Sequence, residues 1–134
     1  MMYTLAVSTA GVSRSIEFMV YESVLTHGNF GKTVANNHFY ITSFIHQLPA
    51  DVFGGSTKDK PAPSKMLLEY GSLKTETDVP STRAGKPRHF FRDRAFVGEF
   101  FRLTRAEPND VVLLERVSDY HLRLSLKKQG SAAA

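Results

Sequence analysis

The chain has 134 residues and no cysteine, which gives room for one domain with a core of its own and excludes disulfide bracing and thiolate metal sites. The formal net charge of +4 favours an anionic partner only weakly. No run approaches the ~20 apolar residues that span a bilayer, and the first fifteen residues lack the features of a signal peptide, so we expect a soluble intracellular protein with no membrane partner.

The N-terminal half combines strand patterns with polar loops. Residues 15–22 alternate apolar and other side chains, which predicts a half-buried strand. The polar, glycine- and asparagine-containing segment 26–38 predicts a loop, and residues 38–42 predict a second strand. Apolar spacing over residues 44–48, before a proline, predicts a helix of two turns. Residues 53–64 predict a long exposed loop that we expect to be the least ordered part of the chain.

The C-terminal half contains two predicted hairpins. One covers residues 65–78 around Gly71, and the other joins residues 110–117 to 120–126. Between them, residues 88–91 predict a brief strand, and Asp93 is expected to cap a helix with four apolar residues in the core: Phe96, Val97, Phe100 and Phe101.

These elements add up to about seven strands and two short helices, with no βαβ rhythm. We therefore expect an all-β domain with two short helices, built as an open seven-stranded barrel or a sandwich. The final GSAAA resembles vector-derived sequence, so we expect one domain over residues 1–129 and a vector-derived tail over residues 130–134.

Three segments resemble the B-three family of DNA-binding pseudobarrels: HFYITSFIHQLP, KMLLEYGSLKTETDV and RHFFRDRAFVGEFFRLTRAEPNDVVLLER. The resemblance covers residues 15–126 and is most specific over residues 88–116. Thr42 stands where plant members usually have proline, and Asn109 stands where they usually have glycine. The bacterial branch is more similar, namely the effector and target-recognition domains of restriction endonucleases such as EcoRII and BfiI. The resemblance implies a seven-stranded DNA-binding pseudobarrel from a prokaryotic cytoplasm.

In this family two projecting arms grip the major groove of a short specific site in double-stranded DNA. Carried over by position, the resemblance implies a first arm over residues 26–38 and a second arm over residues 83–94. Seven of the 17 basic residues lie between Arg83 and Arg105, although such a cluster also fits a merely solvated face.

The residue types in the two arms suit the reading of base edges and phosphates. Arginine meets the O6 and N7 atoms of guanine, asparagine pairs with adenine, and a carboxylate accepts from cytosine N4. Lysine and threonine suit phosphate contacts. The resulting candidates are Arg83, Arg88, Arg92 and Arg94 for guanine, Asn29, Asn36 and Asn37 for adenine, Asp93 for cytosine unless it only caps the helix, and Lys32, Thr33 and Lys86 for phosphates.

The sequence predicts no catalytic residues, no metal site and no cofactor. The nearest approach to a nuclease motif, Pro108, Asp110, Glu115 and Arg116, lacks the required lysine, and no nucleotide-binding or serine-hydrolase motif is present. The leading hypothesis is the recognition or effector domain of a type II restriction endonuclease, with a covalently linked nuclease domain beyond residue 129. The alternatives are a transcription-factor-like module without a nuclease, a protein-interaction barrel with an acidic partner, or a single-strand-binding barrel that stacks bases on Phe30, Phe39, Phe90 or Phe91.

Overall fold

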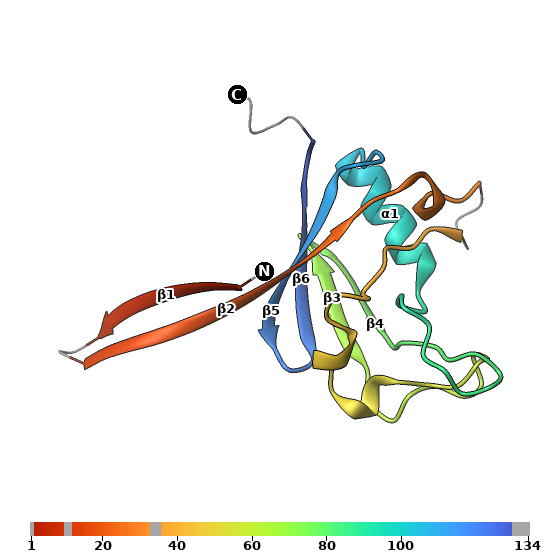
Figure 1. Cartoon of the computed structure of the whole chain (residues 1–134), viewed down its shortest axis with the longest axis horizontal. Helices are drawn as coiled ribbons and strands as arrows, with labels where there is room; N and C mark the ends of the chain where they lie inside the picture. Colours follow the sequence, from red (N-terminus) through yellow and green to blue (C-terminus); the bar gives the residue numbers. More distant parts are fainter. Residues whose placement is uncertain (1, 10–11, 33–35, 130–134) are drawn as a thin grey trace.

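The computed structural model describes residues 2–9, 12–32 and 36–129 (Figure 1). Within these residues the fold is mostly β, with six strands, one α-helix and short 3-10 turns. The strands are β1 (Met2–Thr9), β2 (Val12–Val24), β3 (Met66–Tyr70), β4 (Leu73–Thr77), β5 (Val111–Ser118) and β6 (His121–Lys127), and the helix is α1 (Arg94–Thr104).

Five of the strands form a mixed open sheet in the order β2-β5-β6-β3-β4. Only β3 and β6 run parallel, and the other neighbours are antiparallel. Strand β2 extends beyond the five-stranded sheet. Its residues Val20–Val24 pair with β5, whereas its earlier part pairs with β1. The β1-β2 hairpin therefore extends away from the body of the molecule (Figure 1). The mostly β character is as predicted, and the sheet is open.

Both predicted hairpins and the capped helix are confirmed. The β3-β4 turn places Gly71 at φ +58°, a left-handed conformation that glycine adopts without the penalty of a Cβ atom. The side chain of Asp93 accepts a hydrogen bond from the N–H of Phe96 at 3.0 Å and so caps α1. All four apolar residues predicted for the inner face of this helix are buried. The helix has 11 residues, and no helix in the described part of the chain is long and apolar enough to span a membrane.

Two predicted strands, over residues 38–42 and 88–91, do not form. The two segments meet through a backbone hydrogen bond, from the N–H of Ile41 to the carbonyl of His89 at 2.8 Å, and the chain bends at His89 and Phe90. The alternation that suggested a strand is real, because Phe39 and Ile41 are buried on either side of the exposed Tyr40. Alternation reports a half-buried extended chain, whereas a strand also needs a neighbour in register over several residues. Conversely, the sequence did not predict β1.

The predicted two-turn helix over residues 44–48 is also wrong in type. The chain instead forms two 3-10 turns, Ile45–Gln47 and Ala50–Val52, closed by hydrogen bonds between residues three apart. Pro49 has no N–H to continue the ladder of the first turn, so that turn ends before it. The apolar spacing still reports burial correctly, because Phe44 and Leu48 lie in the core.

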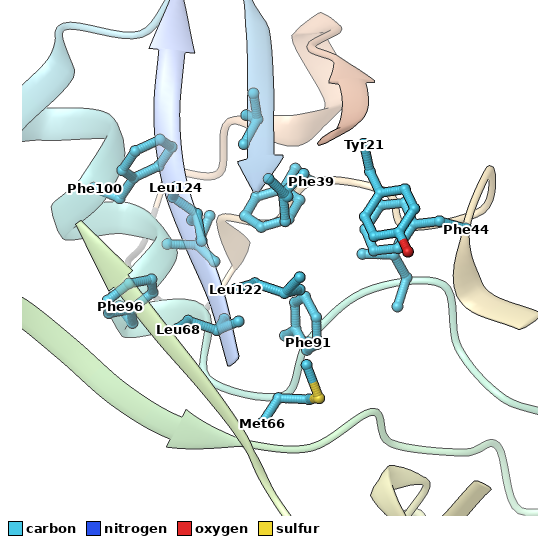
Figure 2. Close-up of a cluster of buried hydrophobic side chains, with 14 of the residues drawn as sticks. Tyr21, Phe39, Phe44, Met66, Leu68, Phe91, Phe96, Phe100, Leu122 and Leu124 are labelled. Atoms are coloured by element: carbon cyan, nitrogen blue, oxygen red, sulfur yellow. The ribbon is translucent and has the colours of Figure 1, made fainter. Parts of the chain in front are cut away.

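The core fills the space between one face of the sheet and a layer made of α1 and the segments around Phe39, Phe44 and Phe91 (Figure 2). Tyr21 of β2 stacks on Phe44, with ring centroids 4.3 Å apart and planes 5° from parallel. Figure 2 shows these aromatic side chains around the leucines of β6. This layer fixes the loops that carry the candidate site, because their roots are part of the core.

Candidate nucleic-acid interface

The two predicted arms lie on the same side of the molecule, opposite the β1-β2 hairpin (Figure 1). The two arms contact each other where they join the core, and we call these parts of the arms their roots. The rings of His38 and Phe90 have centroids 5.1 Å apart, and the Oγ1 atom of Thr42 lies 2.9 Å from Nδ1 of His89. Together with the backbone bond between Ile41 and His89, these contacts hold the end of the first arm against the end of the second. The spacing of the arms is thus set by packed, hydrogen-bonded residues.

Two asparagines of the first arm support its structure. Asn29 is fully buried, and its Oδ1 atom accepts hydrogen bonds from the N–H of Thr26 at 2.8 Å and from the Thr26 hydroxyl at 3.2 Å. The interpretation of Asn29 as an adenine reader does not fit this position, because its amide presents no surface. Asn37 accepts from the N–H of Gly31 at 3.3 Å, and its Nδ2 atom lies 2.8 Å from where a Cβ of Gly98 would be. Asn37 therefore joins the first arm to α1.

Two candidate residues of the first arm are accessible to a ligand. Lys32 and Asn36 are both exposed. The carbonyl oxygen of Asn36 lies 3.0 Å from Nδ1 of His38, which ties the backbone of this segment to the root of the arm. Thr33, the remaining candidate in this arm, lies outside the described residues.

The second arm ends in a tight turn that carries exposed cations. The N–H of Thr82 donates to the carbonyl of Lys86 at 2.8 Å, and Gly85 adopts φ +86°, so the chain reverses within a few residues. Arg83, Lys86 and Arg88 are exposed and make no ion pair with any described residue. The tip and edge of this arm thus present three cations to solvent.

Arg92 lies at the root of the second arm and is used internally. Its Nε atom lies 2.5 Å from Oδ1 of Asp78, and Nη2 lies 3.2 Å from Oδ2 of the same carboxylate. The guanidinium also donates to the carbonyls of Thr57 at 3.0 Å and Gly55 at 2.8 Å. The interpretation of Arg92 as a guanine reader does not fit these contacts, because they occupy four of its five N–H groups.

Asp93 and Arg94 also have partners inside the fold. Besides capping α1, Asp93 accepts a hydrogen bond from the hydroxyl of Thr75 through its second carboxylate oxygen. Both oxygens are engaged, so the structure supports the capping role and not the reading of cytosine. The guanidinium of Arg94 lies over the ring of Phe90, 5.5 Å from its centroid, at the distance of a cation–π contact. Arg94 remains partly exposed.

Asp78 supports the second arm from inside the fold, and the sequence analysis did not identify it. It is buried, accepts from the N–H of Ala62 at 2.7 Å and holds Arg92. These bonds fasten the loop over residues 53–64 to the second arm, so the loop expected to be least ordered is anchored. Nothing in the sequence identified Asp78, because it continues the alternation of Lys74 and Glu76, the charged residues on the exposed face of β4.

A cleft of about 530 Å³ lies beside the root of the second arm. It is lined by side chains of both charges, among them Lys58, Lys65 and Arg94 on one hand and Glu76 and Asp93 on the other. This mixture favours no single charge of ligand, whereas the exposed side chains of the second arm are cationic. The arms are therefore the stronger candidate interface.

The residues that approached a nuclease motif do not converge on one centre. Asp110, which precedes β5, accepts hydrogen bonds from the N–H groups of Gln129 and Glu107. Glu115 lies farther along β5 and pairs with Arg123 of β6. In the described part of the chain, no three histidine or acidic side chains are placed to hold a metal ion together.

No protein-family model matches this chain, and no curated protein is significantly similar to it in sequence.

Proposed function

We propose that the chain is a sequence-specific binding module for double-stranded DNA, and that its two arms enter the same major groove. The observation that supports this proposal is the contact between His38 and Phe90, which joins the bases of two loops that carry exposed basic and amide side chains. Two loops that present polar side chains from a packed β scaffold are suited to a rigid, periodic partner such as a duplex.

The exposed residues fall into two groups, those suited to contact base edges and those suited to contact phosphates. Arg83 and Arg88 present guanidinium forks that match the O6 and N7 acceptors of guanine, and Asn36 presents an amide that matches adenine. Lys32 and Lys86 present point charges suited to phosphate oxygens, which set the register on the duplex. Arg94 is partly held by Phe90 and supplements these contacts from the root.

The fold we propose for the domain is the DNA-binding pseudobarrel that the sequence resembles, with the open sheet and α1 as its scaffold. In a longer protein this module would be the recognition or effector domain of a type II restriction endonuclease of the prokaryotic cytoplasm, and the nuclease domain would be covalently linked. A transcription-factor-like protein would use the same module without a nuclease.

Burial removes two of the four stacking platforms that the single-strand alternative proposed. Of the four phenylalanines considered as stacking platforms, Phe39 and Phe91 are each 1% exposed and belong to the core. Phe30 packs on Phe101, with ring centroids 4.8 Å apart. A base cannot stack on a ring whose faces are covered by the protein's own side chains.

The test is a selection of binding sites from random duplexes, followed by anisotropy titrations over a range of salt concentrations. We expect one short sequence to bind at least a thousandfold more tightly than random duplexes, and the logarithm of the binding constant to fall with slope about −0.9 per phosphate contacted. Equal affinity for every duplex would refute sequence specificity. Displacement of the duplex by an equal concentration of poly-dT would favour the single-strand hypothesis, and no binding at moderate salt would favour an acidic protein partner.

A further inference from the structure

We propose that three aromatic side chains between the arms, His38, Tyr40 and Phe90, form a floor that reads the C5-methyl group of a pyrimidine in the major groove. The inference rests on the proposed function and adds the class of base edge that this surface recognises. The arms supply charged and amide groups for purine edges, and the floor supplies the apolar contact that a methyl group needs.

The floor is one continuous cluster of rings from both arms. His38 contacts Tyr40 edge to face, with centroids 5.0 Å apart, and contacts Phe90 at 5.1 Å. The guanidinium of Arg94 also lies over the Phe90 ring. Because His38 ends the first arm and Phe90 belongs to the second, the cluster joins the two arms.

Tyr40 is directed away from the core. Its neighbours Phe39 and Ile41 are 1% and 0% exposed, whereas Tyr40 is 45% exposed. The extended backbone of this segment turns alternate side chains inward and outward, and Tyr40 is directed outward. Its hydroxyl makes no hydrogen bond to any described residue. An exposed ring at this point adds nothing to the core, but it offers a surface to a partner held by both arms.

The chemical groups that each base presents in the major groove indicate which of them this surface would contact. Guanine, adenine and cytosine present hydrogen-bonding groups there, which arginine, asparagine and carboxylates satisfy. Thymine and 5-methylcytosine also present a methyl group, and only apolar contact with that group discriminates them from uracil and cytosine. The rings of the floor offer aromatic carbon, which supplies the apolar contact that a methyl group needs.

The experiment uses the duplex obtained by site selection and a set of derivatives in which each thymine in turn is replaced by deoxyuridine. Uracil keeps the hydrogen-bonding groups of thymine and lacks only the methyl. A buried methyl contributes enough to change affinity about fourfold, so we expect at least one position to show a loss of that size with the wild-type chain. In a second set each cytosine is replaced by 5-methylcytosine, which distinguishes the two sources of the methyl group.

The matched variants are Tyr40→Ala, Tyr40→Phe and Tyr120→Ala. Tyr40→Ala should abolish the uracil penalty at the sensitive position, and Tyr40→Phe should preserve it because the ring remains. Tyr120 is similarly exposed, at 41%, but lies at the β5-β6 turn, so Tyr120→Ala should preserve the penalty. Thermal unfolding of each variant shows whether it folds.

The outcomes separate this inference from the proposed function. The inference is overturned, while sequence-specific binding stands, if the affinity for the selected site does not change when any thymine is replaced by deoxyuridine or any cytosine by 5-methylcytosine. A methyl penalty that survives Tyr40→Ala also overturns it. Absence of any sequence preference refutes the proposed function itself.

Discussion

The guanidinium of Arg92 and the carboxylate of Asp78 form a paired contact, with an Nε to Oδ1 distance of 2.5 Å and an Nη2 to Oδ2 distance of 3.2 Å. The Asp78 side chain is 3% exposed and that of Arg92 is 20% exposed. The backbone N–H of Arg92 also donates to the carbonyl of Asp78 at 2.8 Å. These bonds connect the end of β4, the loop over residues 53–64 and the root of the second arm, so the pair positions the arm without touching a ligand.

Arg92→Ala is expected to lower the free energy of unfolding by about 3–5 kcal/mol, because it leaves the buried carboxylate of Asp78 without its partner. Urea denaturation measures this loss. Replacing both residues, as Arg92→Met with Asp78→Leu, should recover part of it, since no unpaired charge remains. A loss in Arg92→Ala that is confined to DNA affinity, with unchanged stability, would instead restore Arg92 as a base reader.

Arg88→Ala is expected to reduce affinity for the selected duplex by about 1–3 kcal/mol and to relax the preference at one base pair, because a bidentate contact to guanine is lost. Titrations against the selected duplex and its single-base variants measure both effects. Arg123→Ala is the matched control, since Arg123 is exposed on β6 outside both arms. An equal effect of the two substitutions would show that net charge, and not the second arm, determines binding.

Lys86→Ala is expected to weaken binding to all duplexes by a similar factor. A phosphate contact carries no sequence information, so the ratio between specific and random duplexes should be unchanged. The slope of log binding constant against log salt should become shallower by about 1. A change in the preferred sequence would assign Lys86 to the reading of bases.

Asp93→Ala is expected to lower the free energy of unfolding by about 1 kcal/mol, because α1 loses its N-cap. Asp93→Ser retains a capping oxygen and should restore most of that stability. Both variants should keep the DNA preference of the wild type, which site selection measures. A change of preference at a cytosine in either variant would reassign Asp93 to base reading.

Acidification is expected to destabilise the fold through Asp110. Burial raises the pKa of Asp110, but hydrogen bonds from the N–H groups of Gln129 and Glu107 and from Lys128 outweigh it and lower the pKa below the ordinary 3.8. A carboxyl group whose pKa is lower in the folded state contributes stability above the unfolded value, and that contribution is lost as the pH falls through the folded value.

The measurement is urea denaturation between pH 7 and pH 2, with Asp110→Asn beside the wild type. The wild type should lose stability below about pH 4, and the variant should lose less over the same range because it has no carboxylate to protonate at this position. Parallel curves for the two proteins would contradict the role of Asp110.

The elements that the sequence predicted correctly are those specified by local chemistry. Asp93 followed by an apolar stripe determines α1, and Gly71 between two alternating runs determines the β3-β4 hairpin. The segment around Tyr40 alternates just as clearly, yet it is no strand, because a ladder depends on which backbone lies beside it. Likewise, residue type within the arms implied by the resemblance made Asn29 and Arg92 candidates for base reading, whereas the burial of Asn29 and the ion pair of Arg92 assign both to the scaffold.

The sequence by itself determined the mostly β character, the capped helix, the two hairpins and the concentration of cations between Arg83 and Arg105. Only the tertiary structure decided that the arm roots touch at His38 and Phe90, and that Asp78 fastens the second arm. The physical reason is the separation along the chain over which each kind of interaction acts. Caps, turns and alternation act between residues a few positions apart, whereas these contacts join segments separated by many residues, and their geometry exists only once the core has formed.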